Sequence, residues 1–166
     1  MPFCLEIFMS NQPSVSANPF SVLAQYVKDV SFENLLMSNP NPPSIDEEPE
    51  ILISTDVNNT QSQSTPGAYE VSLTVNAIAQ HKGQKIFIAE VTSVAIITFE
   101  EEFVKEFADY IDPTLCIEIP FYLFFEIRNL IANLSNMGGY PPIFVRPIDF
   151  GAMYQEKMQL STMTKQ

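Results

Sequence analysis

Residues 69–99, YEVSLTVNAIAQHKGQKIFIAEVTSVAIITF, carry the clearest secondary-structure pattern in the sequence. From residue 69 to residue 80, apolar and polar side chains alternate with only Ile78 breaking the polar side, and this period of two predicts a half-buried β-strand. Lys85–Phe99 is apolar at both parities and rich in β-branched residues, which favours a central strand or one covered on both faces. Because only the turn at His81-Lys82-Gly83 separates the two runs, we predict a long antiparallel hairpin.

The sequence before this hairpin predicts two further strands. Residues 22–32 alternate in a similar way, with an interruption at Lys28, and predict another half-buried strand. Residues 38–49 contain four prolines and are therefore expected to form an extended connector. We expect a short strand at Glu50–Asp56 and a polar loop at Asn58–Gly67. The apolar residues that share one parity in the first strand are Val22, Ala24, Tyr26, Val30 and Phe32.

Helices are expected after the hairpin. Glu100-Glu101-Glu102 suits a helix N-terminus because of the helix dipole, and Asp112-Pro113 should end that helix. A longer helix is predicted over residues 119–137, with Gly138-Gly139 as its stop. Its apolar surface is wider than one four-stranded sheet can cover, and this favours oligomerisation. The remaining segments are an extended Pro-rich link at 140–149 and a short helix at Phe150–Leu160.

Length and charge limit what the chain can do. Its 166 residues fit one domain, which we place at residues 21–158, between a flexible N-terminal arm at 1–20 and a short C-terminal tail at 159–166. The net charge is −12 and the pI is near 4.3. Such a charge disfavours binding to nucleic acid and to anionic membranes, and it attracts basic partners. From charge alone, plain solubility is the simpler explanation of the acidity.

Several function classes lack the residues that they need. His81 is the sole histidine, and no nucleotide-binding, zinc-protease or serine-hydrolase motif occurs, so we expect no enzyme, no cofactor and no metal site. No apolar run is long enough to span a membrane, and the first residues make a poor signal peptide. Cys4 and Cys116 are too few for a disulfide framework, which favours a reducing, cytoplasmic location.

Two motifs resemble those of a known family. Residues 26–33, YVKDVSFE, are similar to the tyrosine-x-lysine-aspartate and serine-phenylalanine-glutamate run at the first strand of SecB proteins. Residues 138–150, GGYPPIFVRPIDF, are similar to the SecB segment that leaves the long helix, in which glycine-aromatic-proline-proline precedes proline-x-aspartate-phenylalanine. The two motifs occur in the same order as in SecB proteins, and a predicted hairpin and a long helix separate them. The resemblance therefore extends over residues 21–158.

The resemblance to SecB implies both a fold and a function. The fold is α+β, a four-stranded antiparallel sheet with a long and a short helix, which assembles as a dimer of dimers. The function is that of an ATP-independent molecular chaperone in the cytoplasm. Such a chaperone binds unfolded preproteins, keeps them competent for translocation and delivers them to the SecA motor ATPase for export. Its partners are proteins, with no nucleic acid and no direct membrane insertion.

The resemblance also implies where SecA binds. By matching position, the motor-binding residues are Asp29, Glu33, Ile88 and Glu90. Exposed carboxylates beside one apolar side chain can engage a basic partner surface. The residues taken alone leave an alternative open, since Asp29 and Glu33 also fit the ordinary polar face of a strand, and Ile88 fits the core.

Client binding should use exposed apolar side chains along open surfaces, because the clients share no sequence. We expect one set of contacts where the connector begins and a second set across from it, although core packing explains each residue equally well. The first set is Leu35, Leu36 and Met37, and the second is Phe144, Phe150, Met153 and Tyr154. Two other functions stay open: a SecB-like holding chaperone dedicated to one partner, such as an antitoxin, and a carrier of small apolar ligands. A closed apolar pocket would favour the carrier.

Overall fold

The computed structural model describes residues 19–42, 44, 48–63 and 67–163. The strands are β1 (Phe20–Asn34), β2 (Glu50–Gln61), β3 (Ala68–His81) and β4 (Gln84–Phe99). The helices are α1 (Glu101–Glu106), α2 (Ala108–Pro113), a π-helical turn η1 (Thr114–Glu118), α3 (Ile119–Met137) and α4 (Phe150–Met163). The predicted N-terminal arm, residues 1–20, lies outside the described residues except for Pro19 and Phe20, and Phe20 already belongs to β1.

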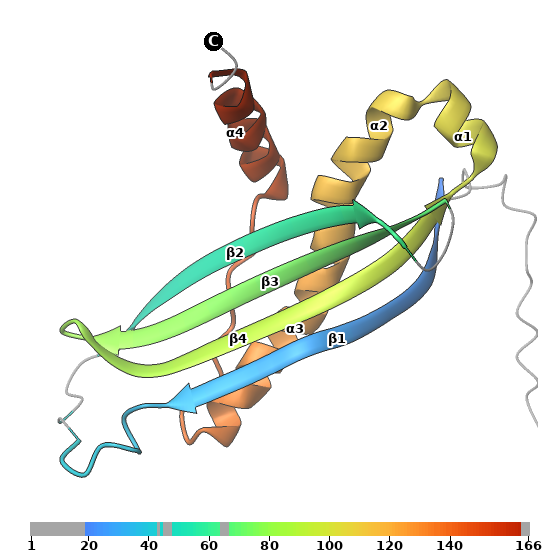
Figure 1. Ribbon diagram of the computed structural model, residues 1–166. Helices are drawn as coiled ribbons and strands as arrows, with labels where there is room; N and C mark the ends of the chain where they lie inside the picture. The colour runs from blue at the N-terminus through green and yellow to red at the C-terminus, as the bar shows by residue number, and fades with distance from the viewer. Residues whose placement is uncertain (1–18, 43, 45–47, 64–66, 164–166) are drawn as a thin grey trace, which may run out of the picture.

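The strands form one antiparallel sheet in the order β1-β4-β3-β2, and α3 crosses one of its faces (Figure 1). This confirms the predicted α+β fold with a four-stranded antiparallel sheet. We call the face against α3 the covered face, and we call the other, which no described helix crosses, the open face. The core lies on the covered face, where Leu73, Val75, Val91 and Ile97 pack with Leu123, Ile127 and Ile131 of α3.

The predicted hairpin is confirmed, and β4 is central, between β1 and β3. Its turn is shorter than predicted, because His81 is the last residue of β3, pairs with Gln84 and is buried. Lys82 and Gly83 have φ angles of +49° and +78°. Two consecutive residues with positive φ reverse a chain within a two-residue turn, so His81 remains in the strand.

β1, at the edge of the sheet, departs most from its prediction. Its side chains from Ser21 to Ser31 are exposed, so the expectation of one buried face is wrong within the single chain. The reason is that α3 packs mainly over β3 and β4. Register irregularities between Val22 and Ala24 and between Val27 and Asp29 also reset the alternation. The apolar residues of one parity are therefore divided between the open face (Ala24, Tyr26) and the covered face (Val22, Val30, Phe32).

β2 is longer than predicted. We expected it to end at Asp56 and to be followed by a loop, whereas it continues to Gln61. The added residues 58–61 pair with residues 69–72 of β3. Their polar side chains concealed this pairing, since an edge strand can keep its backbone ladder without burying apolar side chains.

The helical region runs through the predicted break. Asp112-Pro113 does not end a helix, because α2, η1 and α3 follow one another from Ala108 to Met137. Pro113 and Pro120 lack a backbone N–H, and the π turn between them absorbs the resulting irregularity. The break lies instead at Phe107, with φ −131° and ψ 39°. α4 begins at Phe150 as predicted but ends at Met163, so most of the expected C-terminal tail is helical.

Candidate functional site

Asp29, Glu33, Ile88 and Glu90 lie together on the open face, and we call them the acidic patch. In the register of β1 and β4, Glu33 is opposite Ile88 and Ser31 is opposite Glu90, and directly opposite residues share one face of a sheet. Glu90 therefore faces the midpoint between Asp29 and Glu33 on the neighbouring strand. The three carboxylates form a triangle with Ile88 at its edge.

The carboxylates of the patch differ in their surroundings. Asp29 and Glu33 are exposed, whereas Glu90 is partly buried. Glu90 Oε2 accepts a hydrogen bond of 3.0 Å from Nδ2 of Asn76, its partner on β3. In the next row, the hydroxyls of Thr74 and Thr92 are 2.8 Å apart and hydrogen-bonded. The patch thus combines two solvated charges on β1 with one carboxylate held in the middle of the sheet.

Residues 140–149, here called the strap, connect α3 to α4 without regular structure. Side chains of α3 hold the middle of the strap. The Ile143 N–H donates to Ser135 Oγ at 3.0 Å, and Arg128 Nε donates to the Val145 carbonyl oxygen at 2.9 Å. The Arg128 guanidinium also lies 5.4 Å from the centre of the Phe144 ring, a cation–π contact. The Pro-rich link is therefore fixed along α3.

The start of the strap is tied to the end of β1. Asn34 donates to the Gly138 carbonyl oxygen at 2.9 Å and accepts from the Tyr140 hydroxyl at 2.6 Å. Burial raises the pKa of Tyr140, which keeps its phenol a donor. The Phe32 ring packs so closely on Gly138 that a Cβ atom at this position would lie 2.4 Å from it. Any larger residue at position 138 would therefore force the Phe32 ring to move.

A groove, the strap groove, runs between the strap and β2. Its larger part has a volume of about 540 Å³ and is lined by the charged residues Glu48 and Arg146 as well as by apolar side chains. A mainly apolar part of about 300 Å³ continues towards Pro49 and Tyr140. Ile51 of β2 and Ile143 and Phe144 of the strap line both parts. The outer edge of β2 has no strand partner in the described chain. An extended peptide beside this groove would therefore meet both apolar side chains and unpaired backbone groups.

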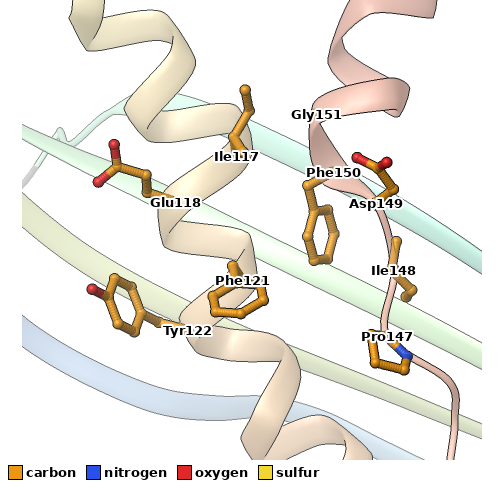
Figure 2. A pocket seen from close by; sticks show the side chains of 9 residues that line it. All are labelled: Ile117, Glu118, Phe121, Tyr122, Pro147, Ile148, Asp149, Phe150 and Gly151. Atoms are coloured by element: carbon orange, nitrogen blue, oxygen red, sulfur yellow. The ribbon is translucent and has the colours of Figure 1, made fainter.

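A second groove, of about 590 Å³, opens between the first residues of α3 and the end of the strap. Figure 2 shows Phe121 and Tyr122 on the helix, with Pro147 and Ile148 on the opposite side. Phe121, Tyr122 and Phe125 are 45%, 53% and 49% exposed. Aromatic surface therefore continues from this groove along α3.

A third groove, of about 320 Å³, lies between β2, η1 and α4 and is lined in part by Cys116, Met153 and Tyr154. The Tyr154 hydroxyl donates to Asp112 Oδ2 at 2.8 Å, and this bond raises the pKa of Tyr154 to about 12. Burial, followed by the charge of Asp112, raises the pKa of Cys116. The thiol therefore stays protonated and weakly nucleophilic near neutral pH.

The structure divides the predicted client-binding residues of the C-terminal set. Phe144 lines the strap groove and is 59% exposed, and Met153 and Tyr154 line the third groove. Phe150 lies in the core and packs against Phe124 with 6.2 Å between ring centres. One edge of Phe150 still forms part of the floor of two grooves.

The first predicted set lies elsewhere. Leu36 is part of the core, whereas Met37 is exposed and Leu35 is partly buried. The N–H groups of Leu35 and Leu36 both donate to the Ile86 carbonyl oxygen, which fixes the turn after β1. None of the three is among the residues that line the strap groove. The first set therefore lies outside the lining of the strap groove, and its part in client binding stays a prediction.

Sequence reasoning missed three residues of these surfaces. Ile51 and Ile53 fell in a predicted strand, but the sequence did not show that their side chains line the strap groove. Asn76 is the third. Asparagine is disfavoured inside strands, so its presence in a predicted strand could have indicated a functional position. The exposed aromatic residues of α3 agree with the prediction that the apolar surface of this helix is wider than one sheet can cover.

Within the described residues, no helix has both the length and the apolar character needed to cross a bilayer. Across the same residues, no three side chains of His, Cys, Asp and Glu come together as metal ligands. What the described chain does present is one acidic sheet face and several open apolar grooves. These features define a protein that binds other polypeptides over extended surfaces.

Comparison with known proteins identifies the family. The family model described as preprotein translocase subunit SecB matches residues 13–161. The protein-export protein SecB of Rhodospirillum rubrum is 36% identical over 151 residues, covering 89% of this chain and 87% of that protein. Its counterpart in Hyphomonas neptunium is 37% identical over 143 residues, covering 85% and 81%. The chain therefore belongs to the SecB family and is a non-enzymatic protein-export chaperone.

A solved structure supports the same fold. It is the Mycobacterium tuberculosis SecB-like chaperone Rv1957, in complex with a ChAD peptide from the Rv1956 HigA1 antitoxin. The TM-score is 0.63, at 12% sequence identity, and the match covers 78% of this chain and 91% of that one.

Proposed function

We propose that this chaperone holds unfolded preproteins in the grooves around the strap and delivers them to SecA through the acidic patch. One observation carries this assignment: the patch lies on the open face, whereas the strap lies on the covered face of the same sheet. A client and the motor protein can then be bound at once, so that transfer does not require the client to be released first.

The chemistry of the patch suits a basic partner. Asp29 and Glu33 are exposed carboxylates in a chain of net charge −12, and a field of this sign increases the association rate of a positively charged surface. The partly buried Ile88 beside them offers apolar contact area. Recognition would therefore combine electrostatic steering with a small apolar contact.

The chemistry of the grooves suits unfolded chains. Phe144 and Ile53 are apolar and substantially exposed, and such side chains accept many sequences because they make no directional demand. The free edge of β2 adds backbone hydrogen bonding, which every peptide can provide. The grooves are open along their length, and this disfavours a carrier of small apolar ligands.

We further propose a cytoplasmic homotetramer, a dimer of dimers. The outer edge of β1 has no partner strand in the described chain, and Val22, Leu23 and Val30 on this strand are exposed. Exposed apolar edges and the aromatic surface of α3 favour association with further copies. Native mass spectrometry should give four times the subunit mass of 18.7 kDa. A monomer at micromolar concentration would contradict the proposal.

One experiment with two ligands tests the two-face arrangement. The triple variant Asp29→Asn, Glu33→Gln, Glu90→Gln should bind SecA at least roughly tenfold more weakly, because each lost charge pair contributes about 0.5–1 kcal/mol. Its affinity for an unfolded preprotein should not change. Phe144→Ala should do the reverse and weaken preprotein binding by about fivefold. Both affinities can be measured by fluorescence anisotropy at fixed salt.

Matched controls come from the same surfaces. Glu70→Gln removes a carboxylate of the open face on β3, outside the patch, and Tyr110→Ala removes a 63% exposed aromatic ring on α2. Neither control should change either affinity. If the triple variant and Phe144→Ala weaken both ligands to the same degree, the two-face assignment is wrong. Competition among unrelated clients would, in addition, exclude a chaperone dedicated to one partner.

A further inference from the structure

Asn76 occupies the middle of the open face. It lies on β3, opposite Glu90 of β4 on one side and Ser54 of β2 on the other. Its Nδ2 donates to Glu90 Oε2 at 3.0 Å. The Asn76 side chain makes no other hydrogen bond with the described part of the chain. The amide therefore acts on the acidic patch and on nothing else that the structure shows.

Asn76 is an unfavourable residue for this position. Asparagine has a low preference for strands, and β3 is an internal strand of the sheet. The Asn76 Oδ1 atom is buried and has no hydrogen-bond partner among the described residues, a condition that costs free energy. Rotating the amide by half a turn would not help, because Oδ1 would then face the Glu90 carboxylate. The contact with Glu90 is thus kept at the expense of stability.

We propose that Asn76 is a positioning residue for SecA recognition, which holds the Glu90 carboxylate in the orientation that the partner's cation meets. The inference rests on the proposed role of the patch. A glutamate side chain has three rotatable bonds, and fixing it before binding removes an entropy cost from association. With Oε2 held by the amide, the second carboxylate oxygen remains available to a basic group.

The register of the strands defines what the partner must offer. Glu90 lies opposite Ser31, between Asp29 and Glu33, and residues two apart on a strand are separated by about 7 Å. A partner surface that fits the patch therefore carries cationic groups spaced on the order of 7 Å apart. One cationic group would meet the fixed carboxylate of Glu90, and others would meet the flexible carboxylates of Asp29 and Glu33. The fixed carboxylate should contribute most to geometric selectivity.

The test uses Asn76→Val, which removes the donor and also removes the unpartnered oxygen. Valine favours strands, so the melting temperature should stay equal or rise. Affinity for SecA should fall roughly three- to tenfold, about the net contribution of one ordinary hydrogen bond, while affinity for an unfolded preprotein stays the same. Asn76→Thr, whose hydroxyl can still donate to Glu90, should recover part of the loss. Ser72→Val, on the same face of β3, is the matched control and should change neither affinity.

A double-mutant cycle separates positioning from a general structural role. In a Glu90→Gln background, Asn76→Val should have little further effect on SecA binding, because the two residues act as one unit. A full additional loss would overturn the inference, as would a lower melting temperature with parallel losses for both ligands. If Glu90→Gln alone leaves SecA binding unchanged, the patch itself is wrongly assigned. If Glu90→Gln weakens binding and Asn76→Val does not, only the inference about Asn76 fails.

Discussion

The covered and open faces are built from the same four strands but carry different chemistry. Along β3, Leu73 and Val75 are fully buried beneath α3, while Thr74 and Asn76, which alternate with them, remain partly exposed and make cross-strand hydrogen bonds. Successive strand residues point to opposite faces, so one segment serves both. The comparison teaches that strand alternation separates the residues that stabilise this fold from those available for recognition.

The largest expected effect comes from shortening leucine side chains on the two faces. Leu73→Ala on the covered face should lower the free energy of unfolding by about 2–5 kcal/mol, because it leaves a cavity in the core. Leu52→Ala is the matched change on the open face, where Leu52 is opposite Ile78 and 42% exposed, and it should cost less than about 1 kcal/mol. Urea denaturation measures both. Equal losses would mean that the open face is packed as well.

A smaller loss of stability is expected at Gly138, where Phe32 of β1 packs against the end of α3 on the covered face. Gly138→Ala should lower stability by about 1–3 kcal/mol, since the new methyl group must displace the Phe32 ring. The φ of Gly138 is −72°, so backbone strain does not contribute. Gly151→Ala in α4, where the nearest atom, the Asp149 carboxylate oxygen, would lie at 3.3 Å, should cost less, because only a small shift is needed and alanine is the better helix former. The melting temperature should therefore fall more in the Gly138→Ala variant than in the Gly151→Ala variant. A Gly138→Ala variant with an unchanged melting temperature would show that the Phe32 ring can move aside without cost.

The smallest effect concerns the contact of Tyr154 with Asp112 at the outer end of the covered side. The pKa of Tyr154 is raised from 10.0 to about 12, so the neutral phenol is favoured in the folded state. The stabilisation is complete below pH 10 and is lost as the pH rises through about 12. Asp112→Ala should lower this pKa towards 10.0, visible as a rise in tyrosinate absorbance at lower pH. The Tyr154→Phe variant should lack the deprotonation step near pH 12. Identical titration curves for the wild type, Asp112→Ala and Tyr154→Phe would contradict the assignment.

The hairpin shows how far sequence reasoning can reach. The alternation of residues 69–80 and the apolar run that follows them predicted both strands and their pairing. They did not predict the register irregularity between Ala79 and Gln80. Counting back from the His81↔Gln84 pair without it would place Asn76 opposite Ala89 instead of Glu90. A one-residue shift exchanges the faces of a strand, so the contact at the centre of the patch depends on a bulge that has no sequence signature.

Two other predictions, the buried face of β1 and the helix end at Pro113, were wrong for the same physical reason. In each case a local irregularity of the backbone departs from the periodic pattern of the sequence. Lys28 interrupts the alternation of β1 and is the unpaired residue of the irregularity between Val27 and Asp29. The interruption indicated where the pattern breaks but not which residues then face the core. Pro113 indicated a helix end by the usual rule, but the neighbouring π turn accommodates it. The motifs at residues 26–33 and 138–150, by contrast, identified the family correctly because they depend on residue identity and order.

The strand order has a consequence for how the protein is made. β1 is the first strand to be synthesised, yet its partner is β4, the last of the four. β2 and β3 can pair with each other as soon as they emerge, and β4 follows its two-residue turn. β1, which is rich in apolar side chains, therefore cannot begin to pair until Phe87 has been added and cannot complete its pairing until Phe99 has been added. During that interval a nascent chaperone carries the kind of exposed strand that chaperones exist to protect.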